Sequence, residues 1–210
     1  MRTVLVHAGI CDASMWDGFD LPGELVRHQL PAPLDDSFAG EPAALVGNSF
    51  GGLVSLDFAV RKPELVTRLV LLDAALPDHE ASDELEEYAV EEDRLLEAGD
   101  IDTAVELNLR FWCPDVAERV RPMVAGAFEW EGEGPETIDL GAVRAPTLVA
   151  VGEHDKQDFH VIAERLAREI PDAELVVIGG GGHLPSLQRP EETQALVRRF
   201  LSGSAPETAR

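Results

Sequence analysis

The feature that most constrains the fold is an alternation of short apolar runs with amphipathic stretches along the chain. Six runs rich in Val and Leu lie at 3–9, 24–30, 43–49, 67–75, 145–155 and 173–180. Most lack strict alternation with polar residues, which is typical of parallel strands covered on both faces. Amphipathic stretches at 50–61, 158–170 and 190–201 have helical spacing. The pattern predicts an α/β fold: a mostly parallel sheet of about six strands, with right-handed crossovers and helices on both faces.

One long segment interrupts this alternation. Residues 77–140 contain no strand pattern, whereas "ASDELEEYAVEEDRLLEAGD" and "IDTAVELNLRFW" have helical periodicity. A third helix is predicted over 115–129, followed by a loop over 129–136. Insertions of this kind often cover a site at the carboxyl ends of the strands, so we expect a small helical lid. The predicted division is a core of 1–76 and 141–201, a lid of 77–140 and a flexible tail of 202–210.

The early connections are short for a parallel sheet. The stretch "PAPLDDSFAGEP" at 31–42 contains three prolines and a glycine, which leave little room for a helix. The crossover at 10–23 also has a turn-like composition. We therefore expect a thinly covered sheet near its first strands, with exposed apolar area and self-association into a homo-oligomer. The alternative is that these short loops fold down and cover the gap within one chain.

Charge and cysteine content narrow the class of protein. The 210 residues have a formal net charge of −23, which argues against binding to nucleic-acid phosphates or anionic membrane surfaces. Two cysteines, Cys11 and Cys113, form no disulfide framework and no zinc-binding pattern. No apolar run approaches the roughly 20 residues of a membrane span, and no signal-peptide pattern is visible. We expect a cytoplasmic protein.

The strongest chemical motif is Gly47-Asn48-Ser49-Phe50-Gly51, which fits G-x-S-x-G. An apolar strand pattern precedes it and an amphipathic helix pattern follows it, as a nucleophile elbow requires. Side chains at Gly47 and Gly51 would collide with neighbouring backbone in such a turn. A plain glycine-rich bend is the simpler alternative. The motif predicts that Ser49 is a nucleophile.

A serine nucleophile needs a base and an orienting carboxylate. His183 follows the last strand pattern in a glycine-rich loop, which could bring its ring to Ser49. Asp155 closes the fifth strand pattern, with Asp158 as the second choice and Glu153 as a further competitor. The order Ser49, Asp155, His183 along the chain is that of α/β-hydrolases.

Backbone N–H groups of Ile10 and Phe50 are the predicted oxyanion donors, one from the loop after the first strand and one after the nucleophile. His7 is expected to brace that first loop. Four aromatic residues could line an acyl pocket, although packing in the core or lid is the simpler role for each: Trp16, Phe111, Trp112 and Trp130. The spacing of "HDKQDFH" at 154–160 matches no known metal site, so we expect no metal and no cofactor.

Four blocks of the sequence resemble the α/β-hydrolase superfamily. They are "LVHAGICDASMWD", "LVGNSFGGLVSLDFAVRKPELVTRLVLLDAAL", "PTLVAVGEHDKQDF" and "GGGGHLPSLQRPEE". The pattern is most similar to 3-oxoadipate enol-lactonase-like hydrolases and small carboxylesterases. The sequence departs from the usual pattern in three places: the hairpin before the first strand is missing, the stretch that usually reads like "DLRGHGRS" is cut to "QLPAPLDD", and the helix leading to the nucleophile strand is absent.

The resemblance implies a serine hydrolase acting on a small carboxylic ester or lactone, with Ser49 as nucleophile, Asp155 as acid and His183 as base. It also implies Ile10 and Phe50 as oxyanion donors. Ser rather than Asp at position 49 argues against the dehalogenases and epoxide hydrolases of the superfamily. Two alternatives stay open: a degenerate hydrolase fold that binds a ligand or partner, and a C–C bond hydrolase or perhydrolase with the same triad.

Overall fold

The computed structural model describes residues 1–128 and 134–203, which contain one six-stranded sheet. Its strands are β1 (Arg2–Val6), β2 (Glu24–His28), β3 (Ala43–Asn48), β4 (Val66–Leu72), β5 (Thr147–Gly152) and β6 (Ala173–Ile178). The spatial order is β2-β1-β3-β4-β5-β6, and all five pairings are parallel. The prediction of an α/β fold with about six parallel strands is confirmed. Parallel pairing brings every strand's carboxyl end to the same edge of the sheet.

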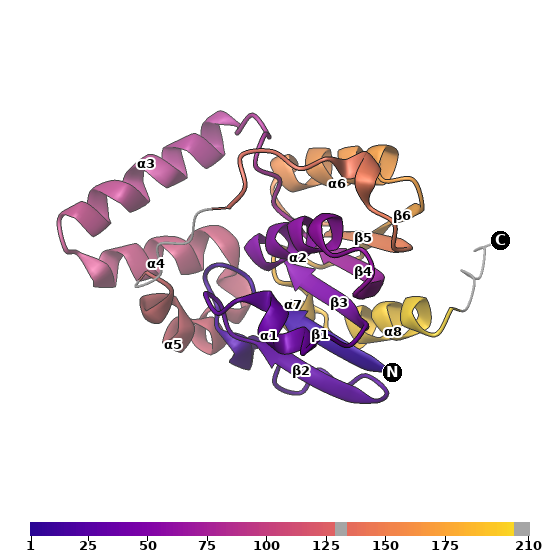
Figure 1. The fold of residues 1–210 in the computed structure, drawn as a ribbon. Coiled ribbons are helices and arrows are strands. Elements are labelled where there is room, and N and C mark those ends of the chain that lie inside the picture. The colour runs from indigo at the N-terminus through magenta and orange to yellow at the C-terminus, as the bar shows by residue number, and fades with distance from the viewer. Residues whose placement is uncertain (129–133, 204–210) are drawn as a thin grey trace.

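Helices cover both faces of the sheet (Figure 1). One face is covered by α1 (Leu34–Phe38), α2 (Phe50–Arg61) and α6 (Gln157–Glu169). The other is covered by a short 3₁₀ helix at Ala13–Trp16, by α7 (Pro185–Gln188) and by α8 (Pro190–Leu201). The three predicted amphipathic helices correspond to α2, α6 and α8.

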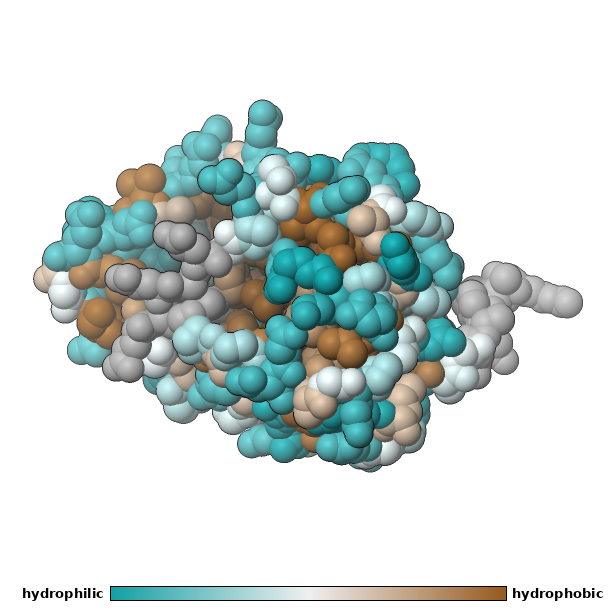
Figure 2. Space-filling model, viewed as in Figure 1, coloured by the Kyte–Doolittle hydropathy of each residue, from teal (hydrophilic) through white to brown (hydrophobic). Residues whose placement is uncertain are grey.

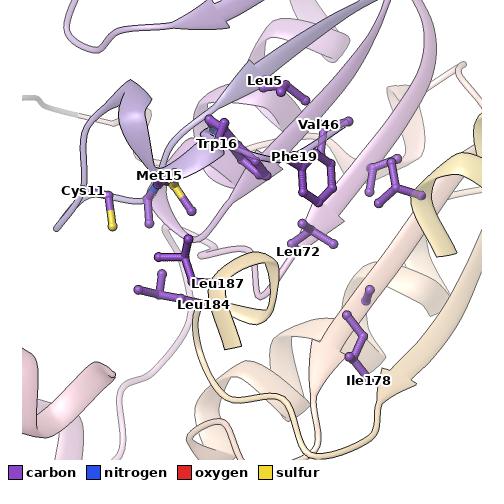
Figure 3. Close-up of a cluster of buried hydrophobic side chains, with 14 of the residues drawn as sticks. Leu5, Cys11, Met15, Trp16, Phe19, Val46, Leu72, Ile178, Leu184 and Leu187 are labelled. Carbon is purple, nitrogen blue, oxygen red and sulfur yellow. Dashed lines mark hydrogen bonds between the residues drawn. The ribbon is translucent and has the colours of Figure 1, made fainter. Parts of the chain in front are cut away.

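The core divides into two clusters, because side chains of a strand alternate between the faces of the sheet. Leu5, Val46 and Leu72 point to the side of the 3₁₀ helix, α7 and α8 (Figure 3). Val4 and Leu45 point to the side of α1, α2 and α6. Both sets are fully buried, so the continuous apolar runs in the sequence reflect strands that are covered twice.

The segment between β4 and β5 is helical, as expected. It forms α3 (Asp83–Glu97), α4 (Ile101–Trp112) and α5 (Ala117–Ala127), which lie together beside the sheet (Figure 1). Ser82 caps α3 by accepting a hydrogen bond from Leu85 N–H, and Asp100 caps α4 in the same way through Thr103 N–H. Part of the predicted loop at 129–136 and most of the tail at 202–210 lie outside the described residues.

The connections at 31–42 and 10–23 cover the sheet more fully than their composition suggests. Residues 34–38 form the one-turn helix α1, and Phe38 is fully buried against Phe58 with ring centroids 4.6 Å apart. On the opposite face, Met15 and Trp16 are 1% and 0% exposed. The expectation of exposed apolar area over the first strands was therefore wrong, because a few large side chains fill the space that longer helices would occupy.

The outer surface in the view of Figure 2 is mainly hydrophilic, with apolar side chains in smaller patches. Within the described residues, no helix is long and apolar enough to cross a membrane.

Candidate active site

Ser49 lies between β3 and α2 in a sharp turn at the carboxyl edge of the sheet. Its backbone has φ 54° and ψ −119°, a conformation that a non-glycine residue rarely adopts. Ser49 N–H donates to Leu72 O at 2.9 Å, and Ser49 O accepts from Gly52 N–H at 2.9 Å. These bonds hold the strained turn in place and leave the side chain at the start of α2.

The two glycines of the motif are required by close approach of backbone. A Cβ at Gly47 would overlap with the carbonyl group of Gly51, and a Cβ at Gly51 would overlap with the carbonyl oxygens of Val6 and His7. Gly51 therefore lets the first turn of α2 pack directly on the end of β1. This contact brings the loop after β1 beside Ser49.

The imidazole of His183 links Ser49 to Asp155. His183 Nε2 lies 2.9 Å from Ser49 Oγ, and His183 Nδ1 lies 2.9 Å from Asp155 Oδ2. The side chains of His183 and Asp155 are 4% and 1% exposed, whereas Ser49 is half-buried. An Nδ1–H donated to Asp155 leaves Nε2 free to accept a proton from Ser49. The structure thus brings together the three residues predicted as a triad, in the arrangement that nucleophilic catalysis requires.

The loop that carries His183 is held by several side chains. Gln188 Oε1 accepts hydrogen bonds from Gly182 N–H at 2.9 Å and Leu184 N–H at 3.1 Å. Asn48 Nδ2, which is fully buried, donates to His183 O at 3.1 Å. The glycine-rich loop is therefore fixed from both sides. Neither Asn48 nor Gln188 was predicted from the sequence, although Asn48 lies inside the serine motif.

The three acidic candidates for the triad have different partners. Asp155 Oδ2 contacts His183, and its Oδ1 accepts from Lys156 N–H at 2.8 Å. Asp158 accepts instead from His79 and Ser82, at 2.9 and 2.7 Å. Glu153 accepts from Gly180 N–H at 2.8 Å. The carboxyl groups of Asp158 and Glu153 therefore form hydrogen bonds with residues outside the predicted triad.

Charge and hydrogen bonding stabilise the ionised form of Asp155. Burial alone would raise the pKa of its carboxyl group, but His183, a second carboxyl group at Asp73 and Lys156 N–H outweigh that effect. The pKa of Asp155 therefore lies below its usual value, and Asp155 is a carboxylate at neutral pH. A carboxylate in this position fixes the orientation of the imidazole.

Two backbone N–H groups flank Ser49. Ile10 follows Gly9, and the ideal Cβ position of Gly9 lies 3.4 Å from Phe50 Cβ, so the loop after β1 touches the start of α2. Among the described residues, Ile10 N–H has no hydrogen-bond acceptor. Ile10, Ser49 and Phe50 all line the same cavity. This placement suits the predicted oxyanion donors.

His7 supports the loop after β1 from behind. Its Nδ1 lies 2.8 Å from Ala8 O, and its Nε2 accepts from Leu30 N–H at 3.0 Å. This pattern assigns the proton to Nδ1, and burial is the main cause that lowers the pKa of His7. His7 therefore stays neutral and braces the loop, as the sequence predicted.

A cavity of about 750 Å³ opens over Ser49 and His183. It lies between the carboxyl edge of the sheet and the helical segment. Its described apolar lining consists mainly of Ile10, Phe50, Leu96, Ile101, Trp112 and Phe128, and its charged lining of Glu92 and Asp93. Such a cavity has the size of a small-molecule site.

The four predicted pocket aromatics have different positions. Trp112 lines the cavity and packs on the His183 ring, with centroids 4.3 Å apart. Phe111 is not among the described lining residues of the cavity; its ring stacks on that of Tyr88, which does line it, with centroids 4.2 Å apart. Trp16 is fully buried against Phe19 in the core and does not reach the cavity (Figure 3). The prediction that Trp16 lines the pocket was therefore wrong, because the 3₁₀ helix turns its ring toward the sheet. Trp130 lies outside the described residues.

A family model described as "Alpha/beta hydrolase family" matches residues 16–196. The chain belongs to this family. It is 31% identical over 190 residues to "Putative carbamate hydrolase RutD" of Variovorax paradoxus, covering 81% of this chain and 70% of that protein. It is 26% identical over 186 residues to carboxylesterase YbfK of Bacillus subtilis, covering 80% of this chain and 60% of that protein.

Solved structures show the same fold. A thermophilic esterase from Thermogutta terrifontis superposes with a TM-score of 0.74 and 25% identity, covering 97% of this chain and 90% of that chain.

Two RutD proteins, from Rhizobium rhizogenes and Agrobacterium fabrum, match over 65% and 66% of their own length. The chain therefore spans about two thirds of the length of these relatives.

Proposed function

We propose that this protein is a serine hydrolase that cleaves a small carboxylic ester or lactone through an acyl-enzyme. One observation carries the proposal: the His183 ring lies 2.9 Å from both Ser49 Oγ and Asp155 Oδ2, at the wall of a cavity. Membership of the alpha/beta hydrolase family and similarity to a carboxylesterase support it.

In the proposed reaction, Ser49 Oγ attacks the substrate carbonyl carbon while His183 Nε2 takes the hydroxyl proton. Ile10 and Phe50 N–H groups stabilise the negative charge on the carbonyl oxygen of the tetrahedral intermediate. The intermediate collapses to an acyl-Ser49 ester, and His183 gives its proton to the leaving alcohol. A water molecule then attacks the acyl group with His183 as base, the bond to Ser49 Oγ breaks as His183 returns the proton to that oxygen, and the acid is released.

The cavity supports a substrate class as well as a reaction. Its apolar lining suits an alkyl or aryl acyl group, and its volume suits a molecule of moderate size. No Lys or Arg is present among its described lining residues, and residues 129–133 contain none in their sequence. A neutral ester or lactone fits this lining better than a substrate with a free carboxylate.

The direct test is hydrolysis of p-nitrophenyl acetate and butyrate by the wild type and by Ser49→Ala. We expect the variant to lose roughly 10⁴- to 10⁶-fold in kcat, the scale seen when a triad serine is removed. Ser202→Ala, at the exposed end of α8, is the matched control and should keep wild-type activity. Wild-type rates in Ser49→Ala would refute the proposal.

Carbamate hydrolysis is a second candidate, because RutD proteins recur among the similar sequences. A carbamate carbonyl can be attacked by the same serine through the same steps. A panel of an ester, a lactone, an aryl carbamate and a vinylogous 1,5-diketone separates ester, lactone, carbamate and C–C bond hydrolysis. The substrate with the highest kcat/KM identifies the reaction, and added hydrogen peroxide tests for perhydrolysis.

A further inference from the structure

A second buried carboxyl group, that of Asp73, lies directly behind the triad. Asp73 follows β4 at the carboxyl edge of the sheet, next to β5, and is 1% exposed. Its backbone has a positive φ of 45°, which among non-glycine residues is most accessible to Asn and Asp. Asp73 N–H donates to Ala150 O at 2.8 Å, so the residue is held between the two strands.

The two carboxyl oxygens of Asp73 have different surroundings. Oδ1 accepts a hydrogen bond from Gly152 N–H at 2.7 Å. Oδ2 is buried and accepts no hydrogen bond from any residue that the structure describes. Gly152 links Asp73 to the turn that carries Asp155, since Asp155 N–H donates to Gly152 O at 3.1 Å, and the two carboxyl groups interact through charge and hydrogen bonding. A buried oxygen without a donor is costly unless it carries a proton itself.

Charge decides which of the two carboxyl groups is protonated. Two carboxylates in contact and away from water cannot both be ionised at neutral pH. Burial raises the pKa of Asp73 well above its usual value, and the negative charge of Asp155 raises it further. Asp155 has His183 and Lys156 N–H to stabilise its charge, whereas among the described residues Asp73 has only Gly152 N–H. Among the described residues, Asp155 is the side chain whose charge raises the pKa of Asp73.

We propose that Asp73 is a positioning residue of the active site: it holds a proton and donates it in a hydrogen bond to Asp155. The pair then carries one negative charge, and Asp155 is anchored from both sides, by Lys156 N–H and by Asp73. The proposal rests on the proposed function in so far as Asp155 orients His183. Its role in the reaction is to keep the Asp155 carboxylate fixed while His183 gains and loses a proton.

The protonation of Asp73 can be measured in the resting protein without any substrate. In protein with ¹³C-labelled Asp carboxyl carbons, we expect one signal at the position of a protonated acid at pH 7, and its absence in Asp73→Asn. Asp158→Asn is the control, because Asp158 is also buried but receives hydrogen bonds from His79 and Ser82. If the signal lost in Asp73→Asn is that of an ionised carboxylate, the proposal is overturned.

Two substitutions then test the effect on catalysis. Asn at position 73 can donate to Asp155 and accept from Gly152 N–H, so Asp73→Asn should keep kcat within about tenfold of wild type. It should also leave the acid side of the kcat/KM pH profile in place, because the pair keeps one negative charge. Asp73→Ala removes both hydrogen bonds and should lower kcat by roughly ten- to a hundredfold.

Equal losses in Asp73→Asn and Asp73→Ala, or a shifted acid side in Asp73→Asn, would show that Asp73 acts as a carboxylate. If Asp73→Ala does not fold, the asparagine variant and the carbon signal still decide the question. If the wild type hydrolyses none of the esters, the carbon signal still reports on the Asp73 proton. Failure of the proposed function is therefore distinguishable from failure of this proposal.

Discussion

Asp155 and Asp158 lie three residues apart, yet their carboxyl groups have separate partners: His183 for Asp155, and His79 and Ser82 for Asp158. This separation gives a matched pair of substitutions. Asp155→Asn keeps the shape of the side chain but favours the wrong imidazole tautomer, so kcat should fall by roughly 10⁴-fold. Asp158→Asn should change kcat far less. Steady-state kinetics on p-nitrophenyl acetate would check both, and comparable losses would remove Asp155 from its role.

Gly51 offers a second test at the level of one residue, because an added Cβ there meets the backbone carbonyls of Val6 and His7. Gly51→Ala should destabilise the fold by about 1–3 kcal/mol, the usual cost of overpacking. Gly126→Ala is the control: it is in helix α5, and beyond that helix's own backbone no described atom lies within 4 Å of its added Cβ. There, alanine should be neutral or stabilising by up to about 1 kcal/mol. Urea unfolding of both variants measures the difference.

At the scale of elements, Asp158 joins α6 to the start of α3. Burial alone would raise its pKa, but hydrogen bonds from Ser82 and His79 outweigh this, and the pKa of Asp158 lies below its usual value. Because the folded state lowers this pKa, the ionised Asp158 carboxylate stabilises the fold at pH values above about 4. That stabilisation is lost as pH falls through the folded-state pKa. Asp158→Asn should therefore lower Tm at pH 7 and have a smaller effect near pH 3. An equal drop in Tm at both pH values would contradict this.

The sequence predicted the larger elements and the triad for local reasons. Apolar runs identify strands that are buried on both faces, and the motif around Ser49 specifies a strand, a turn and a helix within a few residues. Helix α1 was not predicted because its five residues are held by a distant contact between Phe38 and Phe58. Asp73 was missed because its significance depends on β4 lying next to β5, and an acidic residue after a strand otherwise suggests only a turn.

The net charge of −23 on the whole chain, together with Glu92 and Asp93 in the cavity wall, should repel anionic substrates. An anionic ester should therefore have a lower kcat/KM than a neutral ester of similar size. Salt screens this repulsion, with a Debye length of about 8 Å at 0.15 M. Added NaCl should raise kcat/KM for mono-p-nitrophenyl succinate and leave p-nitrophenyl butyrate nearly unchanged. Equal responses to salt would show that charge does not select the substrate.

Self-association stays a prediction, but it now rests on a different exposed surface. The first strands are covered by residues 31–42, whereas Leu175 and Val177 on the edge strand β6 are 39% and 53% exposed. Light scattering measures the outcome directly. A mass above the 22.8 kDa of one chain at micromolar concentration would support association, and a strictly monomeric mass would exclude it.

The proposed reaction requires that Ser49 is a nucleophile activated by His183. A fluorophosphonate probe tests it directly, because such probes bond only to activated serines, and a scaffold without activity would not react. Intact mass spectrometry should show one adduct, and peptide mapping should place it on Ser49. Labelling should be lost in His183→Ala and retained in Ser202→Ala. An unlabelled wild-type protein, or an adduct on another serine, would show that Ser49 is not the activated nucleophile.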